Sequence, residues 1–138
     1  MVASIMRCVF VVPGEPVPKP RQTQADRWKQ RAPVVRYRQF ADLLRFHAGQ
    51  HQWREIEGAR YSLSVRFVLP FPKTTSRKRR SAEAGTPHLV KPDASNLLKA
   101  VEDALFLHDQ AIWSVAAQKY YDDGDGPRTE IVIEWEVV

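Results

Sequence analysis

The 138-residue chain has a single cysteine, Cys8, and no long hydrophobic run. One cysteine excludes an intramolecular disulfide and a zinc site made of cysteines alone. Because Cys8 lies in an apolar stretch, we expect it to be a small core residue. The longest apolar run, 8–13, is far shorter than the about 20 residues needed to cross a bilayer, and no convincing cleavage site precedes Pro13. We therefore expect neither a membrane span nor a signal peptide, and place the protein in a reducing compartment, the cytoplasm.

Internal repeats are also absent, and the length suits one domain, so we expect a single domain over residues 1–138. The chain has 21 Lys and Arg against 16 Asp and Glu, a net charge of +5. Residues 1–99 hold 19 of the basic and 7 of the acidic residues, whereas residues 100–138 hold 2 and 9. This split predicts either that the basic part attracts a polyanion while the acidic part holds carboxylates for another role, or that the two parts pair with each other.

Hydrophobic periodicity predicts four strands and two helices, in the order strand, helix, strand, helix, strand, strand. The strands are expected at 5–12, 60–69, 111–121 and 129–137. Residues 60–69 alternate strictly, so one face of that strand is expected to hold the apolar side chains Tyr61, Leu63, Val65, Phe67 and Leu69. One helix begins near Pro33, and its apolar stripe is expected to be Phe40, Leu43, Leu44 and His47. The second helix begins after Asp93, which can cap it, and is expected to turn Leu98, Val101 and Leu105 to the core. The fold class is therefore α/β (α+β), with a small mixed four-stranded sheet, a hairpin formed by the last two strands, and a dimer that covers the thin structure.

Residues 70–92 show no periodicity, and irregular stretches of this length are usually functional or mobile. We predict a basic mobile loop here. Its basic side chains outnumber its one acid, Glu83, by five: they are Lys73, Arg77, Lys78, Arg79, Arg80 and Lys91. Four consecutive bases favour salt-sensitive contact with a nucleic-acid backbone, and a solvated charged loop is the alternative. A second basic segment, 19–38, contains Lys19 and Arg21, for which we predict the same contact.

The segment KPDASNLLKAVEDALFLHDQ, residues 91–110, carries three aspartates within 17 residues: Asp93, Asp103 and Asp109. Mg²⁺ in phosphodiester hydrolysis is held by one or two carboxylates, with water and phosphate as further ligands. Lys99 lies among them and can stabilise the charge that develops on the phosphate. Together with the basic stretches, this segment predicts a nuclease site. The structural alternative makes Asp93 a helix cap and Asp103 an i, i+4 partner of Lys99.

Two other motifs that could bind a metal fail on their spacing. If DDGDG, 122–126, belonged to an EF-hand loop, the first and twelfth positions would be Tyr121 and Val132. Neither side chain offers the carboxylate that a calcium ligand at those positions requires. We expect a tight acidic turn between strands instead. His47 and His51 are four residues apart, but no third ligand is near, so we expect solvated histidines.

The run KPDASNLLKAVEDAL resembles the signature of the RusA-type Holliday junction resolvases, small endodeoxyribonucleases of bacteria and their phages. The family pattern is Lys-Pro-Asp-x-Asp-Asn-Leu-x-Lys, followed by Asp-Ala-Leu and a further Asp near a strand start. Flanking pieces agree, namely GEPVPKPR at 14–21, the basic loop with Gly85 and His88, and HDQAIW at 108–113. The resemblance implies a Mg²⁺-dependent endonuclease, with Mn²⁺ as the other ion, and no organic cofactor. It implies a homodimer that resolves four-way DNA junctions by symmetric paired nicks in recombination and repair.

Position by position, the resemblance implies catalytic roles for Asp93, Lys99 and Asp109, and a metal site at Asp93, Asp109 and Ser95. Ser95 stands where the family has a second carboxylate, and a hydroxyl is a poorer Mg²⁺ ligand. Asp103 is about 15 Å along the helix from Asp93 and is not expected to replace it. Three hypotheses follow: a junction-resolving endonuclease, a junction-binding protein whose cleavage is impaired by Ser95, or a protein-interaction module whose basic loop binds acidic partners.

Overall fold

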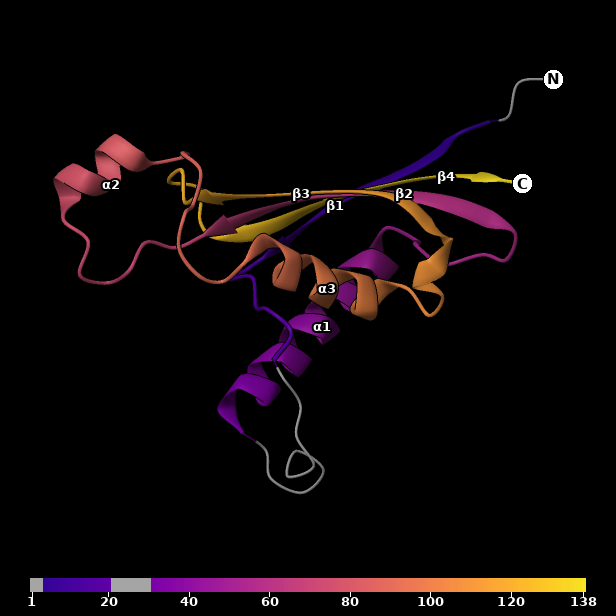
Figure 1. Cartoon of the computed structure of the whole chain (residues 1–138), viewed down its shortest axis with the longest axis horizontal. Helices are drawn as coiled ribbons and strands as arrows, with labels where there is room; N and C mark the ends of the chain where they lie inside the picture. Colours follow the sequence, from indigo (N-terminus) through magenta and orange to yellow (C-terminus); the bar gives the residue numbers. More distant parts are fainter. Residues whose placement is uncertain (1–3, 21–30) are drawn as a thin grey trace.

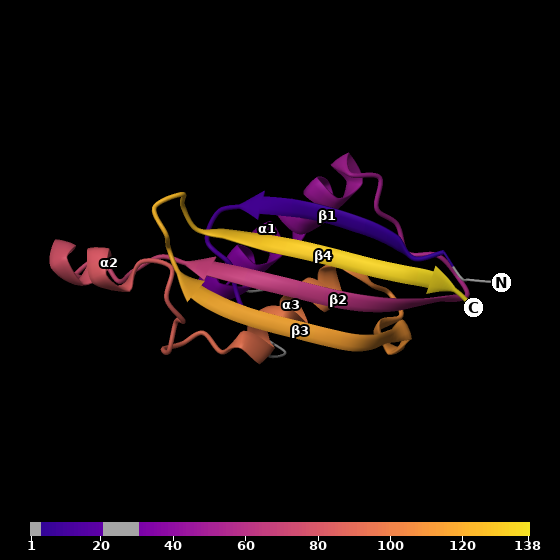
Figure 2. The same cartoon turned by 90° about the horizontal axis from the view of Figure 1, so that it is seen from above.

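The computed structural model describes residues 4–20 and 31–138, and it confirms a mixed α+β fold around a four-stranded sheet. The strands are β1 (Met6–Pro13), β2 (Ala59–Leu69), β3 (Ile112–Tyr121) and β4 (Arg128–Val137). Their order in the sheet is β1-β4-β2-β3. β2 and β3 are parallel, whereas β4 is antiparallel to both β1 and β2. Figure 2 shows the four strands side by side in this order.

The predicted hairpin of the last two strands is wrong, because β2 lies between β3 and β4. β4 is an inner strand, and its Ile131 and Ile133 are completely buried. β3 is an edge strand, where Trp113 is 70% and Val115 is 51% exposed. The strand with the completely buried isoleucines therefore takes the central position, and the turn at 122–127 passes over the end of β2 to reach it. A crossover through a helix makes β3 parallel to β2, which a two-strand hairpin cannot do.

Two helices, α1 (Ala32–Gln50) and α3 (Ala94–Leu105), cover one face of the sheet (Figure 1). A short 3₁₀ helix, η2 (Asp109–Ala111), leads into β3. The predicted inward face of β2 is confirmed, with five side chains at most 2% exposed: Tyr61, Leu63, Val65, Phe67 and Leu69. In the described parts of the chain, no helix is long and apolar enough to span a membrane.

The helix faces differ in detail from the prediction. On α1, Phe40 and Leu44 are buried, but Leu43 is 43% exposed and His47 is only partly buried. The buried stripe of α1 instead continues through alanines and a tyrosine, namely Tyr37, Ala41 and Ala48. On α3, Val101 and Leu105 are buried as predicted, whereas Leu98 is half-buried and the neighbouring Leu97 is completely buried. The predicted stripe was built from large apolar residues and did not include alanines. Their small side chains allow the helix to lie close to the sheet.

Part of the segment 70–92 is helical, which adds a third helix to the two predicted. The helix α2 (Arg77–Glu83) begins after Ser76, whose Oγ accepts a hydrogen bond from Arg79 N at 3.2 Å. α2 has no buried residue and projects beyond one end of the sheet (Figures 1 and 2). A helix that buries no face leaves no apolar periodicity, which is why the sequence pattern did not predict it. Past α2, residues 85–88 run along the outer edge of β3, where His88 N donates to Lys119 O at 3.0 Å.

Candidate active site

Asp93 is held at the start of α3 by the backbone around it. Lys119 of β3 donates from Nζ to the carbonyl oxygens of Val90 and Pro92, the latter at 2.8 Å. Asp93 takes the N-cap position, and its own carbonyl accepts from Leu97 N at 3.1 Å. Its carboxylate makes no capping hydrogen bond, so the predicted side-chain cap is wrong. The exposed carboxylate is thereby left available to solvent and to a ligand.

Lys99 is the centre of a polar cluster on α3. Its Nζ lies 3.3 Å from Asp109 Oδ2 and 3.4 Å from Asp103 Oδ1. The hydrogen bond that Lys99 donates to Asp109, followed by the charge of Asp103, raises the pKa of Lys99. The ammonium is therefore positive at any ordinary pH. The Asp93 side chain makes no hydrogen bond or ion pair with Lys99 or Asp109. Asp93 lies about 9 Å back along the helix axis from Lys99.

The proline-rich segment after β1 joins the same cluster. Lys19 donates from Nζ to Asp103, and its backbone N donates to Asn96 O at 3.4 Å. Asp103 therefore bridges two lysines: Lys99, which is the predicted i, i+4 partner, and Lys19. Lys19 was predicted as a DNA contact only, and the structure places it beside the predicted catalytic lysine. Arg21, predicted with it, lies outside the described residues.

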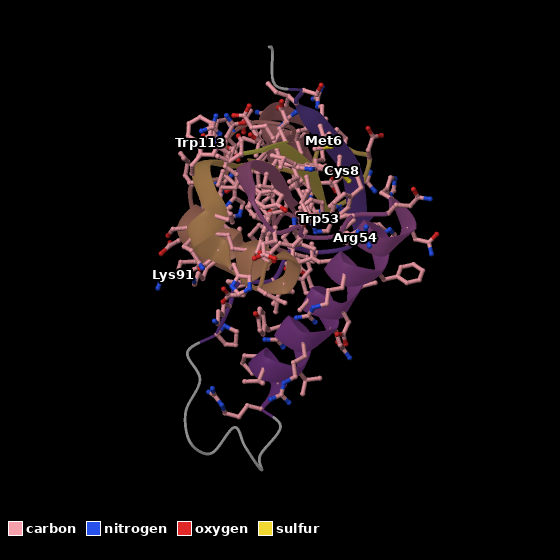
Figure 3. The ribbon with its side chains drawn as sticks, turned by 90° about the vertical axis from the view of Figure 1, so that its right-hand side faces the viewer. Met6, Cys8, Trp53, Arg54, Lys91 and Trp113 are labelled. Carbon is pink, nitrogen blue, oxygen red and sulfur yellow. The ribbon has the colours of Figure 1, made fainter. Side chains whose placement is uncertain are left out.

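Asp109 is positioned by a residue that the sequence did not single out. Glu55 accepts hydrogen bonds from Leu107 N at 2.6 Å and from His108 N at 3.1 Å, and so holds the loop that leads into η2. Its neighbour Trp53 is packed against three aromatic rings at centroid distances of 5.2–5.4 Å: Tyr61, Phe106 and Trp135. Figure 3 shows Trp53 inside the molecule and Lys91 at its outside. No local motif marks Glu55 or Lys119, because both act on backbone groups distant in sequence.

The side chains at this site fit a hard divalent cation. Asp93 and Asp109 supply carboxylates, and Ser95, exposed in the first turn of α3, supplies a hydroxyl. Among the described residues, no three His, Cys, Asp or Glu side chains gather closely enough to form a metal cage. Mg²⁺ is commonly held by one or two carboxylates, with waters and substrate phosphates completing its shell. Asp93, Asp109 and Ser95 are therefore donors of the type that such an open site would use.

The basic residues around α2 divide into two groups. Arg79 pairs with Glu83 at 3.0 Å, and Arg80 donates back to Thr75 O at 3.1 Å and Pro72 O at 3.2 Å. These two arginines stabilise the segment itself. The other predicted contacts are exposed and make no such bond among the described residues: Lys73, Arg77, Lys78 and Lys91.

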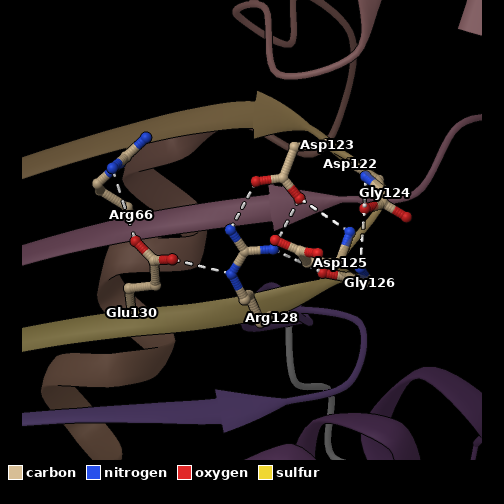
Figure 4. Close-up of polar contacts among 8 residues, drawn as sticks. All are labelled: Arg66, Asp122, Asp123, Gly124, Asp125, Gly126, Arg128 and Glu130. Atoms are coloured by element: carbon tan, nitrogen blue, oxygen red, sulfur yellow. Dashed lines mark hydrogen bonds and ion pairs between the residues drawn. The ribbon is translucent and has the colours of Figure 1, made fainter. Parts of the chain in front are cut away.

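The acidic turn after β3 is structural. Asp122 Oδ1 accepts from Gly124 N and Gly126 N, both at 3.0 Å, and Asp123 pairs with Arg128 at 2.8 Å (Figure 4). Arg128 holds the pKa of Asp123 well below its usual range. These carboxylates are engaged within the turn, as expected of an acidic turn and not of a calcium loop.

Comparison with known proteins gives the same family as the motif. The family model described as "Endodeoxyribonuclease RusA" matches residues 13–134. A protein of Bacillus subtilis strain 168, described as "Uncharacterized protein YqaN", is 28% identical over 139 residues, which cover 93% of this chain and 96% of the relative. The match includes the Asp93 segment, the Lys99–Asp109 contact and α2. The chain belongs to the RusA family of endodeoxyribonucleases.

Proposed function

We propose that the protein is a metal-dependent endonuclease that resolves Holliday junctions by symmetric paired nicks, in DNA recombination and repair. The observation that carries this is the contact of Lys99 with Asp109, in a chain of the RusA family. The carboxylate of Asp93, which makes no capping hydrogen bond, lies about 9 Å back along the axis of α3. An ammonium paired with carboxylates next to an open donor set is suited to phosphodiester hydrolysis.

In this proposal Asp93 and Asp109, with Ser95, hold Mg²⁺ or Mn²⁺. The ion, when bound, supplies Lewis-acid polarisation of a phosphate oxygen. Lys99, kept protonated by its acidic neighbours, stabilises the negative charge that builds on the phosphate and its leaving oxygen. In the reaction a water oxygen bonds to phosphorus, one P–O ester bond breaks, and the leaving oxygen gains a proton.

The substrate symmetry requires two such sites. A four-way junction offers two equivalent strands, and a homodimer with a two-fold axis presents two identical sites to them. The exposed bases of α2 and its flanks, Lys73, Arg77 and Lys78, supply backbone contact that carries no sequence information.

A second candidate follows from Ser95, the position where the family pattern has a carboxylate. A neutral hydroxyl in place of an anion weakens Mg²⁺ binding, so the chain would bind junctions but cleave them slowly. This form of the proposal predicts that Ser95→Asp raises cleavage more than it raises junction binding.

The experiment uses purified protein with a synthetic four-way junction and a linear duplex of equal charge, with Mg²⁺ or Mn²⁺. A resolvase nicks opposite strands of the junction at symmetric positions and leaves the duplex intact. Junction binding without nicks, restored by Ser95→Asp, identifies the impaired form. Equal binding of junction and duplex, with no nicks from either protein, refutes both and leaves an interaction module as the function.

A further inference from the structure

The loop that precedes Asp93 carries two neighbouring apolar side chains on its outer surface. Leu89 is 85% exposed and Val90 is 52% exposed. They lie between His88, which is buried, and Lys91, which Figure 3 shows at the outside of the molecule. Because Leu89 buries so little of its side chain, it contributes almost nothing to the stability of the fold. Two consecutive apolar side chains are therefore presented to solvent close to the candidate active site.

The backbone on both sides of Leu89 is fixed to β3. His88 N donates to Lys119 O at 3.0 Å, and the imidazole ring of His88 lies with its centroid 4.7 Å from that of Tyr121. On the other side, Lys119 Nζ donates to Val90 O. The Leu89 side chain therefore projects from an anchored backbone, so a contact made by it costs little further ordering of the loop.

This exposed tip lies within a few nucleotides of the proposed metal site. Leu89 is four residues before Asp93, and a chain of that length spans at most about 14 Å, or about four steps along a DNA strand. Residues 84–92 include no Asp or Glu, and Lys91 is exposed directly after the apolar pair. The surroundings of the tip therefore favour a polyanion over an acidic protein surface.

The small size of the tip decides between the partners that an apolar surface can bind. A stable protein interface buries about 800 Å² on each partner, which two side chains cannot supply. Binding to a membrane surface likewise requires the apolar face of a whole helix. A base step of DNA, in contrast, accepts a single apolar wedge, and leucine is among the residues that proteins insert in this way.

We propose that Leu89, with Val90 beside it, is a wedge that enters the base stack at the branch point of a four-way junction. Separating stacked bases costs free energy, and the cost is lowest where the stack is already interrupted. The wedge therefore favours a junction over a continuous duplex, whereas the basic side chains around α2 contact phosphates, which both DNAs have. The inference rests on the proposed function and names a residue that selects its branched substrate.

The test compares the affinities of the full chain for a four-way junction and for a duplex of the same sequence, by fluorescence anisotropy without divalent ions. Leu89→Ala is expected to lower the ratio of junction to duplex affinity by about tenfold, because most of the apolar contact is lost. Leu89→Met keeps a long apolar side chain and is expected to retain a ratio within about threefold of the wild type. Leu43→Ala, at an exposed position on α1, is the matched control and is expected to leave both affinities unchanged.

The place where the wedge enters is measured with 2-aminopurine, a base whose fluorescence rises when it is unstacked. The wild type is expected to raise the fluorescence of 2-aminopurine at the branch point and not in the middle of an arm, and Leu89→Ala is expected to lose this rise. An unchanged affinity ratio in Leu89→Ala overturns the proposal. An equal fall in the affinities for junction and duplex also overturns it, because it shows a contact that both DNAs share.

Failure of the wedge is distinguishable from failure of the nuclease, because nicking with Mg²⁺ or Mn²⁺ is recorded on the same proteins. If the wild type nicks junctions and Leu89→Ala keeps the wild-type affinity ratio, only the wedge is refuted. If the junction preference depends on Leu89 but no junction is nicked, only the nuclease is refuted.

Discussion

The division of the bases around α2 leads to a quantitative prediction about DNA binding. Arg77 and Lys78 are exposed and make no ion pair among the described residues, whereas Arg79 is neutralised by Glu83. The variant Arg77→Ala/Lys78→Ala removes two phosphate contacts. The matched control, Arg79→Ala/Glu83→Ala, removes a neutral pair from the same helix and leaves the net charge unchanged.

The magnitude follows from counterion release. Each phosphate contact contributes about −0.9 to the slope of log affinity against log salt on B-DNA, so the slope should become about 1.8 less steep. Between 50 and 200 mM salt, a fourfold range, the ratio of wild-type to variant affinity should then shrink by about tenfold. The control should keep the wild-type slope.

The assay is fluorescence anisotropy of a labelled four-way junction, titrated at several salt concentrations in the absence of divalent ions. An unchanged slope in Arg77→Ala/Lys78→Ala would show that α2 does not contact phosphate. An equal loss in both variants would show that the helix acts through its fold and not through two free charges.

Three further predictions concern residues that hold α3 and the segment before it in place. Replacing the completely buried Leu97 by alanine should lower the free energy of unfolding by about 2–5 kcal/mol, measured by urea denaturation. Lys119→Met removes the donor to the carbonyls that precede Asp93 and should lower junction cleavage while leaving junction affinity in EDTA unchanged; an equal fall in both would refute a positioning role. His88 is 4% exposed, and burial, followed by the charge of Lys119, lowers its pKa below 6.5. Its contribution to stability is therefore present above about pH 6.5 and is lost as the pH falls, so His88→Leu should flatten the melting temperature between pH 7 and 5.

The strands and helices that have a clear hydrophobic periodicity could be predicted from the sequence. Strict alternation on β2 fixed both its extent and its buried face, and the helices that carry apolar stripes were found. The strand order was not predictable from turn chemistry, because the loop at 122–127 resembles a hairpin turn while its strands are separated by β2. α2 was missed because a helix without a buried face has no apolar period.

The site was predictable only as far as its residues lie close in sequence. The motif indicated Asp93, Lys99 and Asp109, and the structure brings the last two into contact. Glu55 and Lys119, which hold the loops on either side, are distant along the chain and bind backbone groups that no sequence pattern reveals. The division of the chain into a basic part, 1–99, and an acidic part, 100–138, did not predict the site either. The ion pair Lys19–Asp103 joins the two parts within it.

The account is tested most directly by strand-specific nicking of a fixed four-way junction, resolved on a denaturing gel, with Mg²⁺ or Mn²⁺. The wild type, or Ser95→Asp if the hydroxyl limits metal binding, should give nicks at symmetric positions in two opposite strands. Asp93→Asn and Lys99→Met should abolish these nicks while retaining junction binding. Intact junctions with both the wild type and Ser95→Asp, under conditions where both proteins bind, would contradict the account.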